Sequence, residues 1–435
     1  MIRHIVIILF LFSFYTFTDA PGAENVAIQA GNILTISGDA VEHGVVLIED
    51  GKIKAVGRDV NIPADARVID ANDKFVMPGF VDTQSRLYVI DSELNEAFAI
   101  TPELNILDAL DPFVKECREV LAQGVTAIYV APGSGGGAVL KLSGGKTAND
   151  MALKVDAAVK LAIGRSPTNQ SSSLMRLEQY SSIREALIET QAYIQQKRKY
   201  EQELAEYTKK KAEQEKQKQA SEKPEVSAPG EEKKEKPKRP TKPKSNPTYE
   251  ILAKVLRKEI PLQIEAHRVD DILNALRLAD EFGFSLILDR CTEGYLIAGE
   301  IARRKVPVII GPASTSFTGM PKLEYRNHDV RNAAILSKSG VKVALGVSGR
   351  DGASSKFIAS AAAIATANGM DRDAALRAIT LTPAEILGVA NRIGSLEAGK
   401  DADIIILSGH PLDTSTKVEM VLIDGKTVYE RKAAQ

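Results

Sequence analysis

The strongest constraint on the fold is a series of short apolar segments that alternate with amphipathic stretches through the middle of the chain. Stretches such as "DDILNALRLADEF" have the apolar spacing of a helix that covers a core. Repeated strand and helix units predict an α/β fold with a parallel sheet, and seven to eight of them favour a closed (β/α)8 TIM-like barrel. An eighth strand is expected within residues 150–165. The other strands are predicted at 75–81, 125–131, 138–142, 261–266, 284–289, 306–311 and 341–347.

Both ends of the chain carry a different pattern, with short alternating strands and tight turns. Residues 24–74 include "GVVLIEDGKIKAVG", in which Asp50-Gly51 separates two apolar runs and signals a hairpin. Residues 391–435 repeat this plan in "VEMVLIDGKTVYER". Neither piece has enough strands for a stable sheet by itself. We therefore predict a small β-sandwich formed by the N- and C-terminal segments, with the barrel between them as residues 75–194 and 248–390.

Residues 195–247 interrupt the barrel pattern with a charged insertion that is rich in Lys, Glu and Pro. Its first part, "KRKYEQELAEYTKKKAEQEKQKQ", permits a helix, whereas the rest contains almost nothing that a core could bury. The prediction is a solvated helix followed by a disordered loop. The basic run "KKEKPKRPTKPK" leaves open that the insertion tethers the protein to a polyanion or to the cell envelope.

The N-terminus has the order of a secretory signal. Arg3 and His4 precede "IVIILFLFSFYTF", which is too short to span a bilayer comfortably, and small residues follow. We predict a signal peptide over residues 1–23 and a periplasmic or secreted mature protein, which meets a membrane only through this segment. An uncleaved membrane anchor is the alternative.

Charge and cysteine content narrow the classes of partner. Lys and Arg together number 56 and Asp and Glu 57, for a net charge of -1, so no global field favours nucleic acid or an anionic membrane. We expect a small-molecule partner and no nucleic acid. Export would permit disulfides, but the chain contains only Cys117 and Cys291. Two buried free thiols are predicted, and a single bridge remains open.

Several segments together resemble the amidohydrolase superfamily, and within it the imidazolonepropionase-like branch. They are "VIDANDKFVMPGFVDTQSR", "IEAHRVDDILNALRLADEFGFSLIL", "TEGYLIAGEIARRKVPVIIGP", "GVKVALGV" and "LTPAEILGVANRIGSLEAGKDADIIIL". The resemblance implies a barrel that hydrolyses non-peptide C–N bonds, in cyclic amides or related small molecules, with a metal-activated water. Relatives often pair, which implies a homo-oligomer.

Most residues that hold the metal in active relatives are missing from this chain. The resemblance implies an Asp-x-His-x-His motif after the first barrel strand. Asp82 matches its aspartate, but Gln84 and Arg86 stand at the two histidine positions. Glutamine is a poor metal ligand, and arginine has no lone pair to give and adds a fixed positive charge.

The ligands from later strands are also altered. His267 matches the histidine of the fifth strand, and the next histidine should fall at Asp289 or Arg290. The final aspartate, a general base in relatives, should fall at Ser348, and Asp351 follows three residues later. Because a catalytic zinc site uses about three protein ligands, we expect no cofactor unless a divalent metal such as zinc binds a site rebuilt around His267. A histidine with satisfied hydrogen bonds is the alternative for that residue.

Lys141 is a further candidate, because some members of the superfamily carry a carbamylated lysine on the fourth strand that bridges two metals. It lies in "AVLKLSGG", which has the pattern of a strand end. Without the first-strand histidines, such a lysine has little to bridge. We favour instead a role in holding an anion or an uncharged group.

Three functions remain open. In the first, the chain has lost most metal ligands and binds a small, anionic ligand at the barrel mouth, in a pocket formed by Asp82, Gln84, Arg86, Lys141, His267, Asp289, Arg290 and Ser348. In the second, it is an atypical hydrolase of non-peptide C–N bonds in which Asp351, Asp289 or His267 performs acid–base work. In the third, it is an envelope scaffold that acts through the charged insertion.

Overall fold

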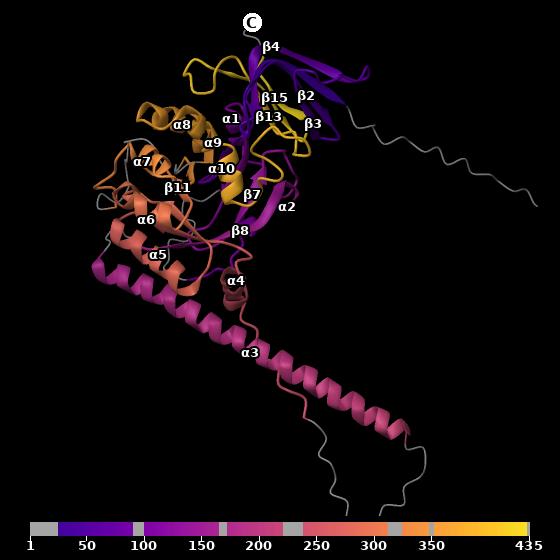
Figure 1. Ribbon diagram of the computed structural model, residues 1–435, viewed down its shortest axis with the longest axis vertical. Coiled ribbons are helices and arrows are strands. Elements are labelled where there is room, and N and C mark those ends of the chain that lie inside the picture. The colour runs from indigo at the N-terminus through magenta and orange to yellow at the C-terminus, as the bar shows by residue number, and fades with distance from the viewer. Residues whose placement is uncertain are drawn as a thin grey trace, which may run out of the picture.

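The computed structural model describes residues 25–89, 100–164, 172–220, 238–311, 324–347 and 352–432. These residues form a sheet from the two ends of the chain, a barrel packed against it, and one long helix that extends away from the body (Figure 1). Within the described ranges, no helix combines the length and apolarity needed to span a membrane. The predicted signal peptide lies outside the described residues.

The first sheet is built jointly by the two ends of the chain, as predicted, but its strands form one continuous sheet and not the two sheets of the predicted β-sandwich. Its seven strands are hydrogen-bonded into one sheet in the order β15-β14-β13-β4-β1-β2-β3. β4 joins the two halves, because it pairs in parallel with β1 and antiparallel with β13. The strands are β1 (Val26–Ile33), β2 (Val41–Glu49), β3 (Lys52–Gly57), β4 (Arg67–Pro78), β13 (Ile404–Leu407), β14 (Val418–Ile423) and β15 (Lys426–Glu430).

Two similar turns close the hairpins of this sheet. Asp50-Gly51 joins β2 to β3, and Asp424-Gly425 joins β14 to β15. All four residues have positive φ angles, between 49° and 74°, as type I′ turns require. The two turns also abut, since a Cβ on Gly51 would lie 2.8 Å from the carbonyl oxygen of Asp424. The hairpin predicted at Asp50-Gly51 is confirmed.

The second sheet has eight strands in chain order, and the α/β barrel prediction is confirmed. The strand expected within 150–165 is present as β8. Inward-facing apolar side chains such as Val81, Ala127, Ile287 and Ala344 fill the barrel, and their alternate neighbours pack outward against the helices. The strands are β5 (Phe80–Asp82), β6 (Val125–Val130), β7 (Gly135–Lys141), β8 (Ala152–Ala162), β9 (Leu262–Ala266), β10 (Leu286–Arg290), β11 (Val308–Ile310) and β12 (Val343–Leu345).

The strand predicted at 75–81 proves to be two. Its first residues end β4 in the terminal sheet, and Phe80 begins β5 in the barrel. The chain crosses between the sheets at Gly79, where a Cβ would lie 2.1 Å from the Thr126 hydroxyl oxygen. A side chain has no room at this crossing, which explains the glycine.

The prediction of an all-parallel barrel is wrong at one strand. β7 runs antiparallel to both β6 and β8, whereas the other adjacent pairs are parallel. Only residues 131–134 connect β6 to β7. A parallel crossover needs roughly a dozen residues or more, so a connection this short permits only a hairpin. The end of β7 therefore lies at the opposite end of the barrel from the ends of its neighbours.

Helices cover the outside of the barrel and connect its strands (Figure 1). α5 is the clearest example, because its apolar face packs on β9 and β10 and Gly283, with φ 73°, caps its end. The α-helices other than α3 are α1 (Cys117–Leu121), α2 (Ala148–Met151), α4 (Pro247–Leu256), α5 (Val269–Phe282), α6 (Ala298–Arg303), α7 (Asn332–Lys338), α8 (Ile358–Ala367), α9 (Arg372–Arg377) and α10 (Leu381–Ile386). Short 3-10 helices are η1 (Ile106–Ala109), η2 (Gly294–Ile297) and η3 (Gly352–Phe357).

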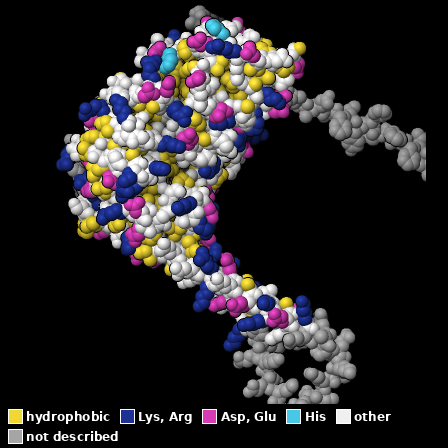
Figure 2. Space-filling model, viewed as in Figure 1, with side chains coloured by type: hydrophobic (Ala, Val, Ile, Leu, Met, Phe, Trp, Pro, Cys, Tyr) yellow, Lys and Arg dark blue, Asp and Glu magenta, His cyan; other side chains and the backbone are white. Residues whose placement is uncertain are grey.

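The long helix α3 (Ser173–Ala220) begins earlier than the predicted extension at residue 195. Its first part covers the barrel through the buried side chains of Ile183, Leu187 and Tyr193. Between residues 194 and 216 no side chain is buried, and this part projects from the body with Lys, Arg, Asp and Glu side chains intermixed (Figures 1 and 2). The predicted disordered loop falls mainly on residues 221–237, outside the described residues.

Both cysteines are free thiols, as predicted. Cys117 is half-buried, and its sulfur lies 3.2 Å from the Tyr88 hydroxyl. Cys291 is fully buried at the end of β10.

Candidate functional site

A polar cavity of about 50 Å³ opens at the barrel end where β5, β6, β8, β9 and β10 finish. Such barrels keep their functional groups at this end of the strands. Three cationic side chains reach the cavity, from Arg86, Lys160 and Arg290. The rest of the lining is Thr83, Gln84, Ser85, Tyr129, Ala131, Pro132, Gly133 and Gln263.

Residues along a barrel strand face the inside and the outside of the barrel in turn, and this alternation points the polar side chains of β8, β9 and β10 inward. Gln263, Glu265 and His267 are every second residue of β9 and its end, and the residues between them face outward into the helical layer. Asp289 follows Ile287 on β10 in the same way, and Lys160 follows Ala158 on β8. All five are largely hidden from solvent.

Asp289 is the centre of this network. Its carboxylate accepts hydrogen bonds from the side-chain amides of Gln84 and Gln263 and from the backbone N–H of Arg290. Lys160 Nζ lies 3.0 Å from its second oxygen. Burial acts to raise the pKa of Asp289, but Lys160 and Arg290 outweigh it and lower that pKa. A fully paired carboxylate with a lowered pKa is suited to be a counter-ion rather than a general base near neutral pH.

Arg290 is held in an unusual conformation at the end of β10. Its φ is 70° and that of Cys291 is 46°, a left-handed pair that costs energy in residues other than glycine. Burial acts against the charge of Arg290, but Tyr325, Glu265 and Asp289 outweigh burial and raise its pKa. Its Nη1 donates to the carbonyl of Gly311 at 3.3 Å, while the buried Nε has no hydrogen-bond partner among the described residues.

Asp82 closes the barrel rather than lining the cavity. Its oxygens accept hydrogen bonds from the backbone N–H groups of Gln84 and Val347, each at 3.0 Å, and from the Ser355 hydroxyl at 2.6 Å. Burial raises the pKa of Asp82, although these hydrogen bonds oppose the shift. The aspartate thus ties the first barrel strand to the chain that follows the last one.

His267 is buried beside the network and does not line the cavity. Its Nδ1 lies 2.8 Å from the Thr292 hydroxyl, its Nε2 lies 3.6 Å from Glu265 Oε1, and its ring packs edge-on against Tyr325. These contacts match the alternative of a histidine with satisfied interactions. Ser348 and Asp351 lie outside the described residues.

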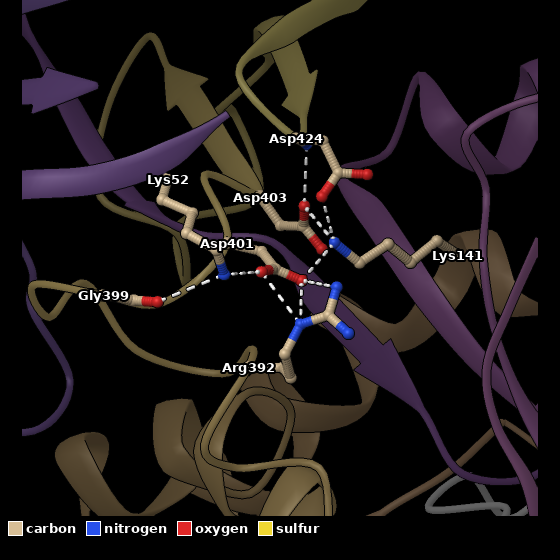
Figure 3. A network of polar contacts seen from close by, with 7 residues as sticks. All are labelled: Lys52, Lys141, Arg392, Gly399, Asp401, Asp403 and Asp424. Carbon is tan, nitrogen blue, oxygen red and sulfur yellow. Dashed lines mark hydrogen bonds and ion pairs between the residues drawn. The ribbon is translucent and has the colours of Figure 1, made fainter. Parts of the chain in front are cut away.

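The placement of Lys141 in the ligand pocket is wrong. Lys141 ends β7, and because β7 is antiparallel its side chain lies at the far end of the barrel, against the terminal sheet (Figure 3). Its Nζ contacts Asp401 at 2.7 Å, Asp403 at 3.1 Å and Asp424 at 2.5 Å. The lysine that the fourth barrel strand carries at the cavity is Lys160, which the sequence analysis missed. Its signal was an inward position in "AAVKLA".

We name the group around Lys141 the interface cluster; it joins the barrel to the terminal sheet and comprises Lys52, Lys141, Arg392, Asp401, Asp403 and Asp424 (Figure 3). Burial acts to raise the pKa of Asp401, but Arg392 and Lys141 outweigh it and lower that pKa to about 2. Burial raises the pKa of Asp403 to about 6, although Lys141 opposes the shift. One oxygen of Asp403 is buried and has no hydrogen-bond partner within the residues that the structure describes.

We expect Asp403→Asn to remove one component of the pH dependence of stability. Between pH 4 and 6 the unfolded aspartate has lost its proton while the folded one retains it, so wild-type stability falls as pH rises through this window. Asparagine does not titrate and can still accept from Lys141. The stability of the variant relative to wild type should therefore rise by about 2–3 kcal/mol from pH 4 to pH 7, measured by urea unfolding. If the free energies of unfolding of the variant and the wild type changed equally with pH, Asp403 would not be the group that titrates.

The residues at the cavity do not fit the divalent metal that the family resemblance implies. Gln84 and Gln263 turn amide N–H groups toward Asp289, and Lys160 and Arg290 bring positive charge where a metal would need lone pairs. Among the described residues, no three His, Cys, Asp or Glu side chains are arranged to hold a metal ion. We therefore derive no catalytic step through a metal.

The chain is similar in sequence to several known proteins. The model of the amidohydrolase family matches residues 300–428. A dihydroorotase of Anaeromyxobacter dehalogenans is 28% identical over 171 residues, which are 35% of this chain and 38% of that protein. An L-hydantoinase of Paenarthrobacter aurescens is 36% identical over 67 residues, or 15% of this chain and 14% of that protein. The chain thus aligns with well under half the length of these curated relatives.

Solved structures extend the similarity over nearly the whole chain. An adenosine deaminase from Xanthomonas campestris with bound zinc is 18% identical, with a TM-score of 0.51 over 94% of this chain and 93% of that one, which supports the fold alone. An amidohydrolase from Thermotoga maritima is 30% identical over 93% of this chain and 100% of that one, with a TM-score of 0.76. With this degree of identity across the full fold, the chain belongs to the amidohydrolase superfamily.

Proposed function

We propose that this chain is an exported member of the superfamily that binds a small anionic molecule at the barrel mouth and has lost metal-dependent hydrolysis. One observation carries the proposal: three cationic side chains, Arg86, Lys160 and Arg290, line the cavity at the end of the strands where the resemblance implies imidazole ligands. The expected ligand is a small carboxylate, because guanidinium groups bind carboxylates through charge-assisted hydrogen bonds.

Charge and hydrogen-bonding capacity both favour an anion. Lys160 is paired with Glu265 and Asp289, so the guanidinium groups of Arg86 and Arg290 are the cations that the cavity offers to an anion. The Nε of Arg290 and the hydroxyl of Tyr129 are buried without hydrogen-bond partners in the described part of the chain, and both residues line the cavity, which supports a ligand that accepts hydrogen bonds. A cavity of about 50 Å³ is several times the roughly 10–15 Å³ that one water needs, and it suits the polar end of a small molecule.

Export and self-association belong to the same proposal. The basic head, apolar run and small residues at the N-terminus support a periplasmic or secreted location. A small ligand from that compartment, and no nucleic acid, is the proposed partner. We also propose that the protein forms a homo-oligomer, because relatives in the superfamily often pair.

Retained hydrolysis of a non-peptide C–N bond is the second candidate. It is favoured by the names of two relatives, a dihydroorotase and an L-hydantoinase, each aligned over only part of its length. Under this alternative Asp289 or His267 would perform acid–base chemistry. Assays with dihydroorotate and hydantoin, with and without added Zn²⁺ and Mn²⁺, would favour it if turnover disappeared in Asp289→Asn.

Under the binding proposal, we expect Arg86→Ala and Arg290→Gln to weaken binding of acetate or inorganic phosphate by about 10- to 100-fold, measured by titration calorimetry. Each change removes a cationic group from the cavity. Arg331→Ala is the matched control, because Arg331 is exposed and pairs only at the surface with Asp329. Unchanged anion affinity in both cavity variants would rule out this site.

A further inference from the structure

We infer that the chain has a second anion-binding surface, outside the barrel, at which residues 238–246 bind a linear phosphate polymer. We name these residues the basic strip. The sequence leaves open a polyanion as the partner of the charged insertion, and the structure describes how the basic end of that insertion is presented. The inference does not depend on which molecule the barrel mouth binds.

The basic strip turns its prolines inward and its cations outward. Pro240, Pro243 and Asn246 are half-buried, and the residues between them are exposed. This period of three is that of polyproline II, which a proline-rich chain favours, and no residue of the strip belongs to a helix, turn or strand. The exposed cations are Lys238, Arg239, Lys242 and Lys244. A stiff, extended backbone therefore holds four positive charges toward solvent.

The strip leaves the body of the protein at a fixed point. It ends at Asn246, whose side chain accepts a hydrogen bond from the Tyr249 N–H and caps α4. α4 in turn is held against α3. The rings of Tyr193 and Tyr249 pack 5.7 Å apart, and Lys197 Nζ lies 2.8 Å from Glu250 Oε1. In Figure 1 the chain before α4 runs outward on the same side as the projecting part of α3.

The insertion is positively charged although the whole chain is nearly neutral. Residues 195–247 contain 16 Lys and Arg and 10 Glu, which leaves 40 Lys and Arg and 47 Asp and Glu in the rest of the chain. Along α3 the cations alternate with glutamates and form pairs such as Lys199 with Glu203. The basic strip contains no acidic residue, and none of its four cations forms an ion pair with another described residue. The positive charge that is available to a partner is therefore concentrated in the strip.

Distance separates the strip from the negative charge of the body. From Lys238 to Pro247, an extended chain at 3.1 Å per residue covers about 28 Å. The Debye length at physiological ionic strength is about 8 Å. Most of the strip therefore lies beyond the range over which the body would cancel its attraction for an anion.

A linear polyanion fits the strip better than a flat bilayer does. The four cations lie along a row of about 19 Å, at 3.1 Å per residue, and one polymer strand can follow that row alone. A flat anionic bilayer would also meet the exposed glutamates of the projecting part of α3, among them Glu201, Glu206 and Glu213, which would repel it.

Two other kinds of partner fit less well. Domains that bind proline-rich peptides dock the prolines themselves, but Pro240 and Pro243 are the half-buried residues of the strip. Single-stranded nucleic acid is bound by stacking its bases on aromatic side chains, and the strip contains no aromatic residue. The partner is therefore a polymer of closely spaced phosphate groups without bases.

The test measures the affinity of the full-length protein for end-labelled inorganic polyphosphate by fluorescence anisotropy. Neutralisation of four phosphates gives a slope of about −3 for log affinity against log salt, so wild-type affinity should fall roughly 50-fold between about 50 and 200 mM NaCl. Replacement of all four cations by glutamine should lower the affinity at the lower salt concentration by about 10-fold or more, and should flatten the salt dependence.

A variant with the same change in charge makes the result specific. Lys209→Gln, Lys210→Gln, Lys211→Gln and Lys216→Gln together remove four exposed cations from α3 and should lower the affinity by a much smaller factor. All the replaced side chains are exposed, so both fourfold variants should unfold at the wild-type midpoint. Arg86→Ala should leave polyphosphate binding unchanged, because it alters only the barrel mouth.

Three results would overturn the inference. Equal losses in the two fourfold variants would assign binding to the net charge of the insertion and not to the strip. Tighter binding to single-stranded DNA than to polyphosphate of equal phosphate content would indicate a nucleic-acid surface. Tighter binding to phosphatidylglycerol vesicles would indicate a membrane surface. Acetate binding at the barrel mouth is measured separately in the same variants, so its loss would count against the proposed function alone.

Discussion

Lys141→Met should lower the free energy of unfolding by about 3–5 kcal/mol at pH 7. Lys141 is 6% exposed and contacts three aspartates, two of them buried. Burial acts to lower the pKa of Lys141, but Asp403, Asp401 and Asp424 outweigh burial and raise that pKa, so the lysine is charged in the folded protein. Methionine preserves much of the side-chain volume but removes the charge and the three hydrogen bonds that Nζ donates, which leaves Asp403 buried without a counter-ion.

The penalty should depend on pH in a definite direction. Asp401 keeps Arg392 and Lys52, and Asp424 is partly exposed, so the uncompensated charge falls on Asp403. Protonation of Asp403 removes that charge, and Lys141→Met should therefore be less destabilising at pH 5 than at pH 8. Urea unfolding across this range measures the difference.

Lys52→Met is the matched control within the same cluster. Lys52 is 52% exposed and pairs with Asp401, which retains Arg392 and Lys141, so we expect a loss below about 1 kcal/mol. Equal losses in Lys52→Met and Lys141→Met would show that the interface cluster does not act as a buried ion network.

Arg176→Met should cost a similar amount, about 3–5 kcal/mol, for the same physical reason at a different place. Arg176 lies in the first turn of α3, and its guanidinium donates to Asp271 on α5 and to Glu324. The side chains of these three residues are 7%, 1% and 3% exposed. Removal of the guanidinium leaves two buried carboxylates without it and loosens the start of α3 from the barrel.

Arg184→Met on the same helix is the matched control, because it removes an ion pair at the surface instead of a buried one. Arg184 binds Glu281 through both carboxylate oxygens, but the two side chains are 45% and 38% exposed. Water and salt screen such a pair, so we expect Arg184→Met to lower stability far less than Arg176→Met in thermal or urea unfolding. If Arg176→Met were as mild as Arg184→Met, Arg176 would not anchor α3.

Local patterns predicted most elements of the fold. Alternating or continuous apolar runs located all eight barrel strands, and Asp-Gly pairs located the hairpins at Asp50-Gly51 and Asp424-Gly425. The predictions that failed concerned the connections between strands. The four-residue link after β6 forces β7 to run antiparallel, and Gly79 divides one apparent strand between two sheets. Charge pattern placed the start of the helical extension at residue 195, whereas α3 begins at Ser173 and its first part packs on the barrel.

The residues of the candidate site were likewise predictable where their identity was informative, and not where their position depended on the pairing of distant strands. Sequence comparison singled out Gln84, Arg86 and Arg290, and all three line the cavity. It named Lys141 and did not consider Lys160, because the direction of β7, which decides the end of the barrel that Lys141 reaches, is not visible in the local sequence. It also treated Asp289 as a general base, whereas the fold surrounds this carboxylate with two amides and a lysine.

The sequence by itself determined the order of strands and helices, the joint sheet of the two termini and the presence of glutamine and arginine at positions 84 and 86. These features depend on side-chain periodicity and residue identity, and both can be read from residues that are close together in the sequence. Only the tertiary structure decided that Lys160 meets Glu265 and Asp289, and that Lys141 meets the aspartates of the terminal sheet. Strand direction and register arise from hydrogen bonds between distant segments, and a shift of one residue or a reversal of one strand exchanges the side chains that meet.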